Sequence, residues 1–225
     1  MKVRGREITP FIAAVGAILA VTVIICASAV SCNRITITFE TTFYFVCYKS
    51  EDNYLSASSV SDAVSSYGGA GYILELDGEY FITVSCYYSE SDANAVRDSL
   101  SKRELNCFVL KKETKEYSLP RSAGKNAELY KGNLNTLTSL SSLAYTCANK
   151  LDTGEYSQAN AKRILADLLT GINSLQNANA GNCFSSELNR LCTICEDAGK
   201  GIIYSKDLRK LQIAIADTVI NIELY

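Results

Sequence analysis

The sequence predicts an α+β protein: a four-stranded antiparallel sheet with two helices on one face, followed by an all-α four-helix bundle, with an N-terminal transmembrane helix. Three observations predict it. An uncharged apolar run covers residues 11–30. Between residues 38 and 116, segments with the patterns of strands and of helices alternate. From residue 126 to residue 225, after a linker over 117–125, apolar residues recur at helical spacing.

The N-terminal run, Phe11 to Val30, has the length and composition of a membrane anchor. Its 20 residues, at about 1.5 Å of helical rise each, span a hydrocarbon core of ~30 Å. Basic residues precede the run, at Lys2, Arg4 and Arg6. The positive-inside rule therefore predicts a cytoplasmic tail over 1–10, an anchor in the lipid bilayer over 11–30 and an extracytoplasmic remainder. Two alternatives stay open, a signal peptide cleaved at Ala27-Ser28-Ala29 and a lipoprotein signal ending at Cys32. All three export the chain, so we expect a single-pass protein of the cell membrane.

Composition argues against several function classes. The formal net charge of the chain is −2 and like charges do not cluster, which argues against nucleic acid as a partner. The chain has no histidine, the commonest general base and metal ligand. We therefore expect a protein that is not an enzyme and that uses neither cofactor nor metal.

The elements of the first exported domain follow from local patterns. Strands are predicted over residues 41–48, 72–76, 80–87 and 107–110, because these runs are rich in β-branched and aromatic residues. Helices are predicted over 59–66 and 92–102, with Ser91 as the cap of the second. Asp77-Gly78 is a two-residue hairpin signal. The resulting order, β-α-β-β-α-β, is the split βαββαβ arrangement of ferredoxin-like domains.

The two halves of this domain repeat each other. Phe43-x-Phe45-Val46-Cys47-Tyr48-x-Ser50 matches Ile82-x-Val84-Ser85-Cys86-Tyr87-x-Ser89, and Asp62-Ala63 and Asp92-Ala93 begin the inner faces of the two helices. With its second helix ending at Leu100, the domain resembles, over residues 40–115, the sporulation-related repeat (SPOR) domain of bitopic bacterial envelope proteins. In that family each half opens with a pattern like V-x-V-G-x-F-x-S. The resemblance implies binding to peptidoglycan glycan strands at division or sporulation septa.

Strand alternation assigns the residues of this domain to two faces. We expect the following residues to face the two helices of the domain: Phe43, Phe45, Cys47, Ile82, Val84 and Cys86. We expect the following residues to face outward as the glycan-binding site: Tyr44, Val46, Tyr48, Thr83, Ser85 and Tyr87. Aromatic rings and hydroxyls on an open face suit a neutral polysaccharide, although tyrosine is also a good strand residue at any half-exposed surface.

Residues 126–225 are predicted to form an up-down bundle of four helices that binds a protein partner or self-associates. The predicted third helix carries the CxxC motif Cys192-Thr-Ile-Cys195. These cysteines are a candidate disulfide or redox pair, half of a metal site with Cys147 and Cys183, or two small core residues. Cys47 and Cys86 are expected to be buried apolar residues held apart by the strand arrangement.

Three functions follow. The leading hypothesis is a membrane-anchored envelope protein that binds peptidoglycan glycan strands, which needs the outward sheet face to be exposed. The alternative is a structural module that assembles an envelope complex without binding glycan, in which that face is covered. The third is a thiol oxidoreductase, which needs Cys192 or Cys195 to be accessible with a lowered pKa.

Overall fold

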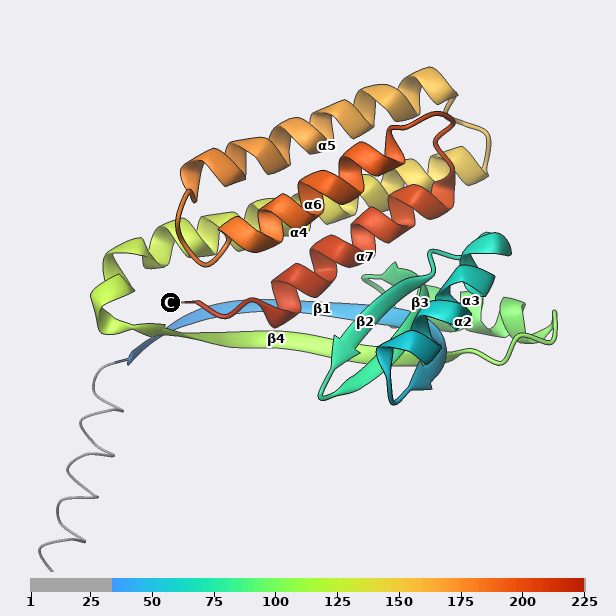
Figure 1. The fold of residues 1–225 in the computed structure, drawn as a ribbon, viewed down its shortest axis with the longest axis horizontal. Helices are drawn as coiled ribbons and strands as arrows, with labels where there is room; N and C mark the ends of the chain where they lie inside the picture. Colours follow the sequence, from blue (N-terminus) through green and yellow to red (C-terminus); the bar gives the residue numbers. More distant parts are fainter. Residues whose placement is uncertain (1–33, 225) are drawn as a thin grey trace, which may run out of the picture.

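The computed structural model describes residues 34–224 of the 225 residues (Figure 1). The expected tail over 1–10 and anchor over 11–30 lie outside the described residues. Among the described residues, no helix is both long enough and apolar enough to cross a membrane. The predicted fold class, α+β, is confirmed: an antiparallel sheet lies between two short helices and four long ones (Figure 1).

The sheet contains four strands, β1 (Arg34–Glu51), β2 (Tyr72–Leu76), β3 (Glu79–Tyr87) and β4 (Phe108–Pro120). Their order across the sheet is β2-β3-β1-β4, and every neighbouring pair is antiparallel. Asp77 and Gly78 make the hairpin turn between β2 and β3, with φ of 54° and 84°, the positive values that a type I′ turn requires. The predicted order of elements, β-α-β-β-α-β, is confirmed.

The strands β1 and β4 extend beyond the segments predicted for them. Residues 34–38 of β1 pair with residues 116–120 of β4, so the first part of β1 has only β4 as a neighbour. The segment 117–125, expected to be a linker, is instead the end of β4 followed by the 3₁₀ helix η1 (Arg121–Asn126). Apolar residues alternate with threonine from Ile35 to Phe39, a strand pattern that agrees with the longer β1.

Two helices, α2 (Tyr54–Ser66) and α3 (Glu90–Ser101), lie on one face of the sheet, as predicted. Both begin earlier than expected because of their caps. The side chain of Asn53 accepts a hydrogen bond from the backbone N–H of Ser56 at 2.9 Å. The cap of α3 is Ser89 rather than Ser91, since its hydroxyl accepts from the N–H of Asp92.

Four long helices cover the other face: α4 (Ala127–Asp152), α5 (Gln158–Ala178), α6 (Ser185–Ala198) and α7 (Ser205–Asn221). Each packs on the next, α4 also packs along α7, and together they form an up-down bundle (Figure 1). The helices α4 and α7 contact the strands, whereas α5 lies farthest from the sheet. The four helices predicted from apolar periodicity are all present.

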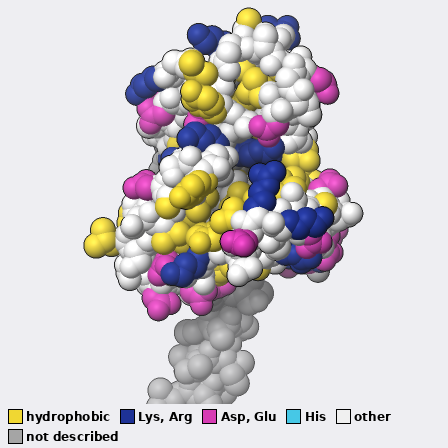
Figure 2. Space-filling model, turned by 90° about the vertical axis from the view of Figure 1, so that its right-hand side faces the viewer, with side chains coloured by type: hydrophobic (Ala, Val, Ile, Leu, Met, Phe, Trp, Pro, Cys, Tyr) yellow, Lys and Arg dark blue, Asp and Glu magenta, His cyan; other side chains and the backbone are white. Residues whose placement is uncertain are grey.

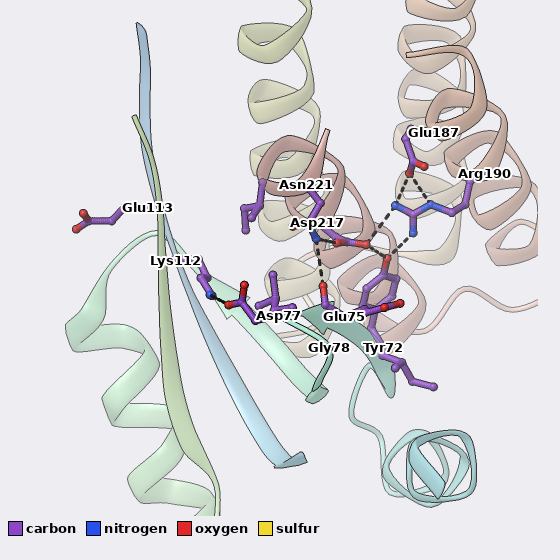
Figure 3. A pocket seen from close by; sticks show the side chains of 13 residues that line it. Tyr72, Glu75, Asp77, Gly78, Lys112, Glu113, Glu187, Arg190, Asp217 and Asn221 are labelled. Carbon is purple, nitrogen blue, oxygen red and sulfur yellow. Dashed lines mark hydrogen bonds and ion pairs between the residues drawn. The ribbon is translucent and has the colours of Figure 1, made fainter. Parts of the chain in front are cut away.

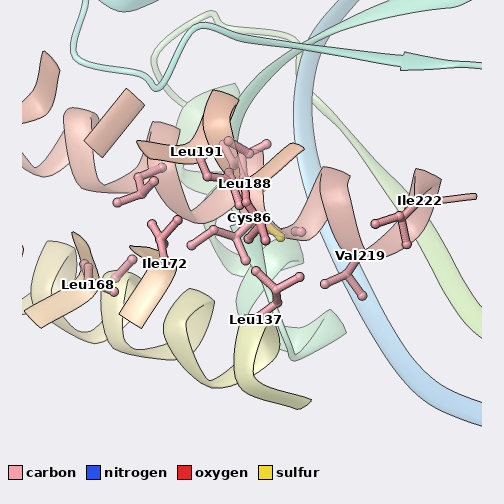
Figure 4. Packing of buried hydrophobic residues seen from close by; sticks show 14 of the residues in the cluster. Cys86, Leu137, Leu168, Ile172, Leu188, Leu191, Val219 and Ile222 are labelled. Atoms are coloured by element: carbon pink, nitrogen blue, oxygen red, sulfur yellow. The ribbon is translucent and has the colours of Figure 1, made fainter. Parts of the chain in front are cut away.

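One hydrophobic core joins the sheet to the bundle. Cys86 of β3 lies among Leu137, Leu188, Leu191 and Val219 of the bundle helices (Figure 4). The same cluster also takes in buried side chains from the other three strands: Ile37, Phe43, Phe45, Leu74, Tyr117 and Leu119. The two segments expected as separate domains, 38–116 and 126–225, therefore share their core.

Candidate functional site

The residues expected to bind glycan do not lie on an open face. Val46, Thr83, Ser85 and Tyr87 are buried, with at most 6% of their surface exposed. The other two, Tyr44 and Tyr48, are half-buried. The expectation of an outward-facing stripe is therefore wrong.

Two layers of helices explain the burial. Val46 and Tyr87 pack against Ala93 of α3, on the face that also carries α2. The set expected to face α2 and α3 lies mostly on the other side: Phe43, Phe45, Cys47 and Cys86 belong to the core shared with the bundle. Along β1 alternation separated the two sets correctly, but it could not show which helices cover which set, because both sets are apolar enough to be buried.

Irregular register between β1 and β3 breaks the grouping that strict alternation predicted for Thr83 and Val84. Shifts on either side of Cys47 place this residue opposite Thr83, and the Cys47 Sγ lies 3.9 Å from the Thr83 hydroxyl. Val84 lines a pocket between α2 and α3, the side expected for it, whereas Cys86, expected on the same side, lies in the core shared with the bundle. A β-bulge of this kind breaks strict alternation, so a pattern of period two cannot reveal it.

The predicted burial of Cys47 and Cys86 is confirmed, and both thiols are free. Their expected separation is not observed, since Cys86 pairs with Phe45, two residues from Cys47. Burial raises the pKa of the Cys47 thiol to about 12 and also raises the pKa of Cys86. Both sulfurs are therefore protonated at neutral pH.

The CxxC cysteines are also free and buried. Cys192 donates to the Asn173 Oδ1 at 3.3 Å, whereas Cys195 donates to the Leu165 carbonyl at 3.6 Å. Burial raises the pKa of both thiols, that of Cys195 to about 12. A redox cysteine needs a lowered pKa, so this geometry does not favour the oxidoreductase hypothesis. Among residues 34–224, no three His, Cys, Asp or Glu side chains gather as a metal site would require.

A polar cleft of about 660 Å³ lies where β2 and β4 meet α6 and α7 (Figure 3). At its wall the Arg190 guanidinium donates to Glu187 at 2.8 Å, to Asp217 at 3.2 Å and to the Tyr72 hydroxyl. Tyr72 in turn donates to Asp217 at 2.5 Å, and Asn221 donates to the same carboxylate at 2.7 Å. These groups satisfy one another, so they form a polar clasp between bundle and sheet rather than free ligand-binding groups.

A second, apolar concavity of about 120 Å³ lies between α2 and α3, and we call it the α2–α3 pocket. Its walls include the side chains of Tyr48, Val64, Tyr67, Val84, Leu100 and Leu105. Tyr67 is 86% exposed, unusual for an aromatic side chain that has apolar neighbours. Figure 2 shows the molecule from the end that carries α2 and α3, and apolar side chains gather there on the lower half of the described surface. One predicted glycan-binding residue, Tyr48, thus contributes to this pocket.

The loop after α2 closes the pocket from one side. A Cβ placed on Gly69 would lie 2.7 Å from the Val64 Cγ1 and 3.2 Å from the Val84 Cγ1, so glycine lets this loop pack directly on the pocket wall. Val64 and Tyr67 lie at helical spacing with Val60 and Ala63, a pattern that is equally typical of a helix face packed on a core, so the pocket was not predicted. The available signal was that α2 carries more apolar residues than one contact face can bury.

Comparisons of the chain with protein-family models, with curated proteins and with solved structures found no match. What the protein binds is therefore inferred from its own surfaces.

Proposed function

We propose that the protein is a structural module that assembles a protein complex at the cell envelope, held at the membrane by residues 11–30. In this proposal the α2–α3 pocket receives one apolar side chain of a protein partner. The observation that carries the proposal is that helices cover both faces of the sheet. An assembly module is expected to have the outward sheet face covered, whereas glycan binding needs that face exposed.

The size of the pocket favours a protein partner over a small molecule. Sites for small ligands typically enclose ~300–1,000 Å³, whereas this pocket encloses about 120 Å³. That volume suits a single aliphatic or aromatic side chain. Interfaces often depend on one such anchor in a well-packed pocket.

The chemistry of the pocket favours a protein over a glycan. Sugar hydroxyls need hydrogen-bond partners when they leave water. Only Tyr48 and Tyr67 carry side-chain hydroxyls at this pocket, and the remaining walls, formed by residues such as Val64, Val84, Leu100 and Leu105, offer none. The glycan binding implied by the SPOR resemblance would use residues such as Val46 and Tyr87, which α3 covers.

The position of the pocket is consistent with binding of a partner at a distance from the proposed membrane anchor, residues 11–30. β1 begins at Arg34, at the end of the molecule opposite to α2 and α3 (Figure 1). A module attached through residues that precede Arg34 would present the pocket at its far end.

Site-specific photocrosslinking tests the proposal in the full chain. A photoreactive phenylalanine analogue replaces the exposed Tyr67 at the pocket rim, and intact cell envelopes are irradiated. We expect a crosslink to one protein, identified by mass spectrometry. Ala63 also lines the pocket, so Ala63→Trp fills it and should weaken capture about 30-fold, the loss typical of a hot-spot residue. Ser59→Trp adds the same side chain one turn away on α2 and should leave the crosslink unchanged.

Either of two outcomes would overturn this function. One is a crosslink of equal intensity in Ala63→Trp and Ser59→Trp, because the pocket would then not be the contact site. The other is sedimentation of the chain with purified sacculi that increases after an amidase removes the stem peptides, together with no protein crosslink. That result would restore the glycan-binding hypothesis.

A further inference from the structure

Three cations lie together at the end of the molecule where β1 begins. Arg34 opens β1, and η1, which follows β4, carries Arg121 and Lys125. η1 rests on β1, because a Cβ placed on Gly124 would come within 2.9 Å of the Ile35 Cδ1. All three cations are exposed. Segments that are distant in sequence thus bring positive charge to one end.

None of these three cations forms an ion pair with a carboxylate of the described chain. Elsewhere Arg97, Lys200 and Arg209 each pair with an aspartate, but among residues 34–224 no ion pair involves the three cations at this end. The Arg34 guanidinium contacts only a backbone oxygen, that of Ser118, at 3.4 Å. Residues 117–127 contain no Asp or Glu, and Glu116 and Glu128 flank them.

The sequence places this end close to the membrane if residues 11–30 span it. Three residues, 31–33, separate the apolar run from Arg34. An extended chain covers at most ~3.6 Å per residue, so Arg34 lies within about 14 Å of the hydrocarbon boundary. That distance is comparable to the Debye length of ~10 Å at 0.1 M salt.

We infer that this end of the molecule faces the bilayer and that Arg34, Arg121 and Lys125 bind anionic lipid headgroups. The inference rests on the membrane attachment that forms part of the proposed function. Guanidinium and ammonium groups donate well to phosphate oxygens. Leu129, in the first turn of α4, is 41% exposed next to η1 and can enter the interfacial layer. Headgroup contacts at this end would fix the orientation of the α2–α3 pocket relative to the membrane.

Vesicle flotation tests the inference on residues 34–225, which include the whole shared core. The vesicles contain either phosphatidylcholine alone or phosphatidylcholine with phosphatidylglycerol. We expect flotation only with the anionic vesicles at 50 mM salt and its loss at 500 mM. Each basic residue near an anionic surface changes partitioning about five-fold, so Arg34→Gln, Arg121→Gln and Lys125→Gln together should lower it on the order of 100-fold.

A matched triple variant makes the result specific. Lys102→Gln, Arg103→Gln and Lys162→Gln remove three exposed cations, two just after α3 and one near the start of α5. These two segments lie at the end of the molecule opposite to η1 (Figure 1), so the triple variant should leave flotation unchanged. Equal losses in the two triple variants, or equal flotation with neutral and anionic vesicles, would overturn the inference. Absence of flotation with either vesicle would also overturn it. None of these results bears on the crosslink at Tyr67, so the inference and the pocket can fail separately.

Discussion

At the scale of single residues, Tyr117 shows how a side chain can join β4 to the bundle. Its hydroxyl donates to the backbone carbonyl of Val219 in α7 at 2.5 Å, and only 7% of its surface is exposed. Burial, which disfavours the phenolate, raises the pKa of Tyr117 to about 12, and a hydrogen bond with Thr114 partly opposes this effect. The protonated hydroxyl is the form that the folded state holds.

The raised pKa of Tyr117 predicts a loss of stability at alkaline pH. An unfolded tyrosine loses its proton near pH 10, so the stabilisation from Tyr117 is complete below about pH 10 and is lost as the pH rises to about 12. A difference of two pKa units corresponds to ~2.7 kcal/mol of unfolding free energy. Urea denaturation at pH 9 and pH 11.5 should therefore show a smaller decrease for Tyr117→Phe than for the wild type. An exposed control, Tyr67→Phe, should keep the decrease of the wild type; equal decreases in all three proteins would contradict the prediction.

At the scale of elements, local signals in the sequence were sufficient to place the helices and strands. The four strands and the six helices α2 to α7 occur where periodicity, caps and the Asp77-Gly78 turn predicted them, with ends that differ by several residues. The first part of β1 was missed although Ile35 to Phe39 alternate in a strand pattern, whereas its pairing with residues 116–120, which are distant in sequence, could not be predicted. Such pairings are set by tertiary contacts, which local propensity does not contain.

The polar clasp belongs to this scale because it joins α6, α7 and β2. We expect Arg190→Met to lower the unfolding free energy by roughly 1–3 kcal/mol, less than for a fully buried ion pair because the side chain is about a third exposed. Urea denaturation would measure the loss. Arg97→Met, which removes an exposed ion pair with Asp98, should cost under about 1 kcal/mol.

A double mutant separates the clasp from the packing of the Arg190 side chain. Arg190→Met combined with Asp217→Asn should cost less than the sum of the two single changes, because the groups interact directly. Strict additivity would show that the two residues stabilise the fold independently.

At the scale of the whole molecule, the shared core decides what the sequence could and could not predict. Apolar periodicity identified the bundle, but it could not show that the bundle packs on the sheet, since an isolated bundle has the same pattern. The burial of the residues expected to bind glycan could not be predicted for the same reason, because periodicity does not show which helices cover which face of the sheet. Once the bundle covers one face of the sheet, the glycan-binding stripe must lie under α2 and α3, and the open surface moves to the pocket between these two helices.

A shared core predicts one cooperative unfolding transition for residues 34–225. Far-UV circular dichroism reports the helices, and tyrosine fluorescence reports both layers because the chain has 14 tyrosines and no tryptophan. The two urea transitions should coincide. A fragment of residues 34–120 would expose Phe43, Phe45 and Leu119 and should aggregate. Two separate transitions, or a soluble and folded fragment, would show that the sheet and the bundle are independent domains.

The interior position of β1 has a consequence for how the chain reaches its native state. β1 is synthesised before β3 and β4, yet it lies between them, and Arg34 finds its partner only when Pro120 has been made. Contacts between residues so far apart in the sequence slow folding, typically to milliseconds or seconds. Until then the segment Thr41–Tyr48, rich in β-branched and aromatic residues and free of charge and proline, is open to pairing with other chains. The order of synthesis thus leaves β1 without its two neighbouring strands until residues 79–87 and 108–120 have been made.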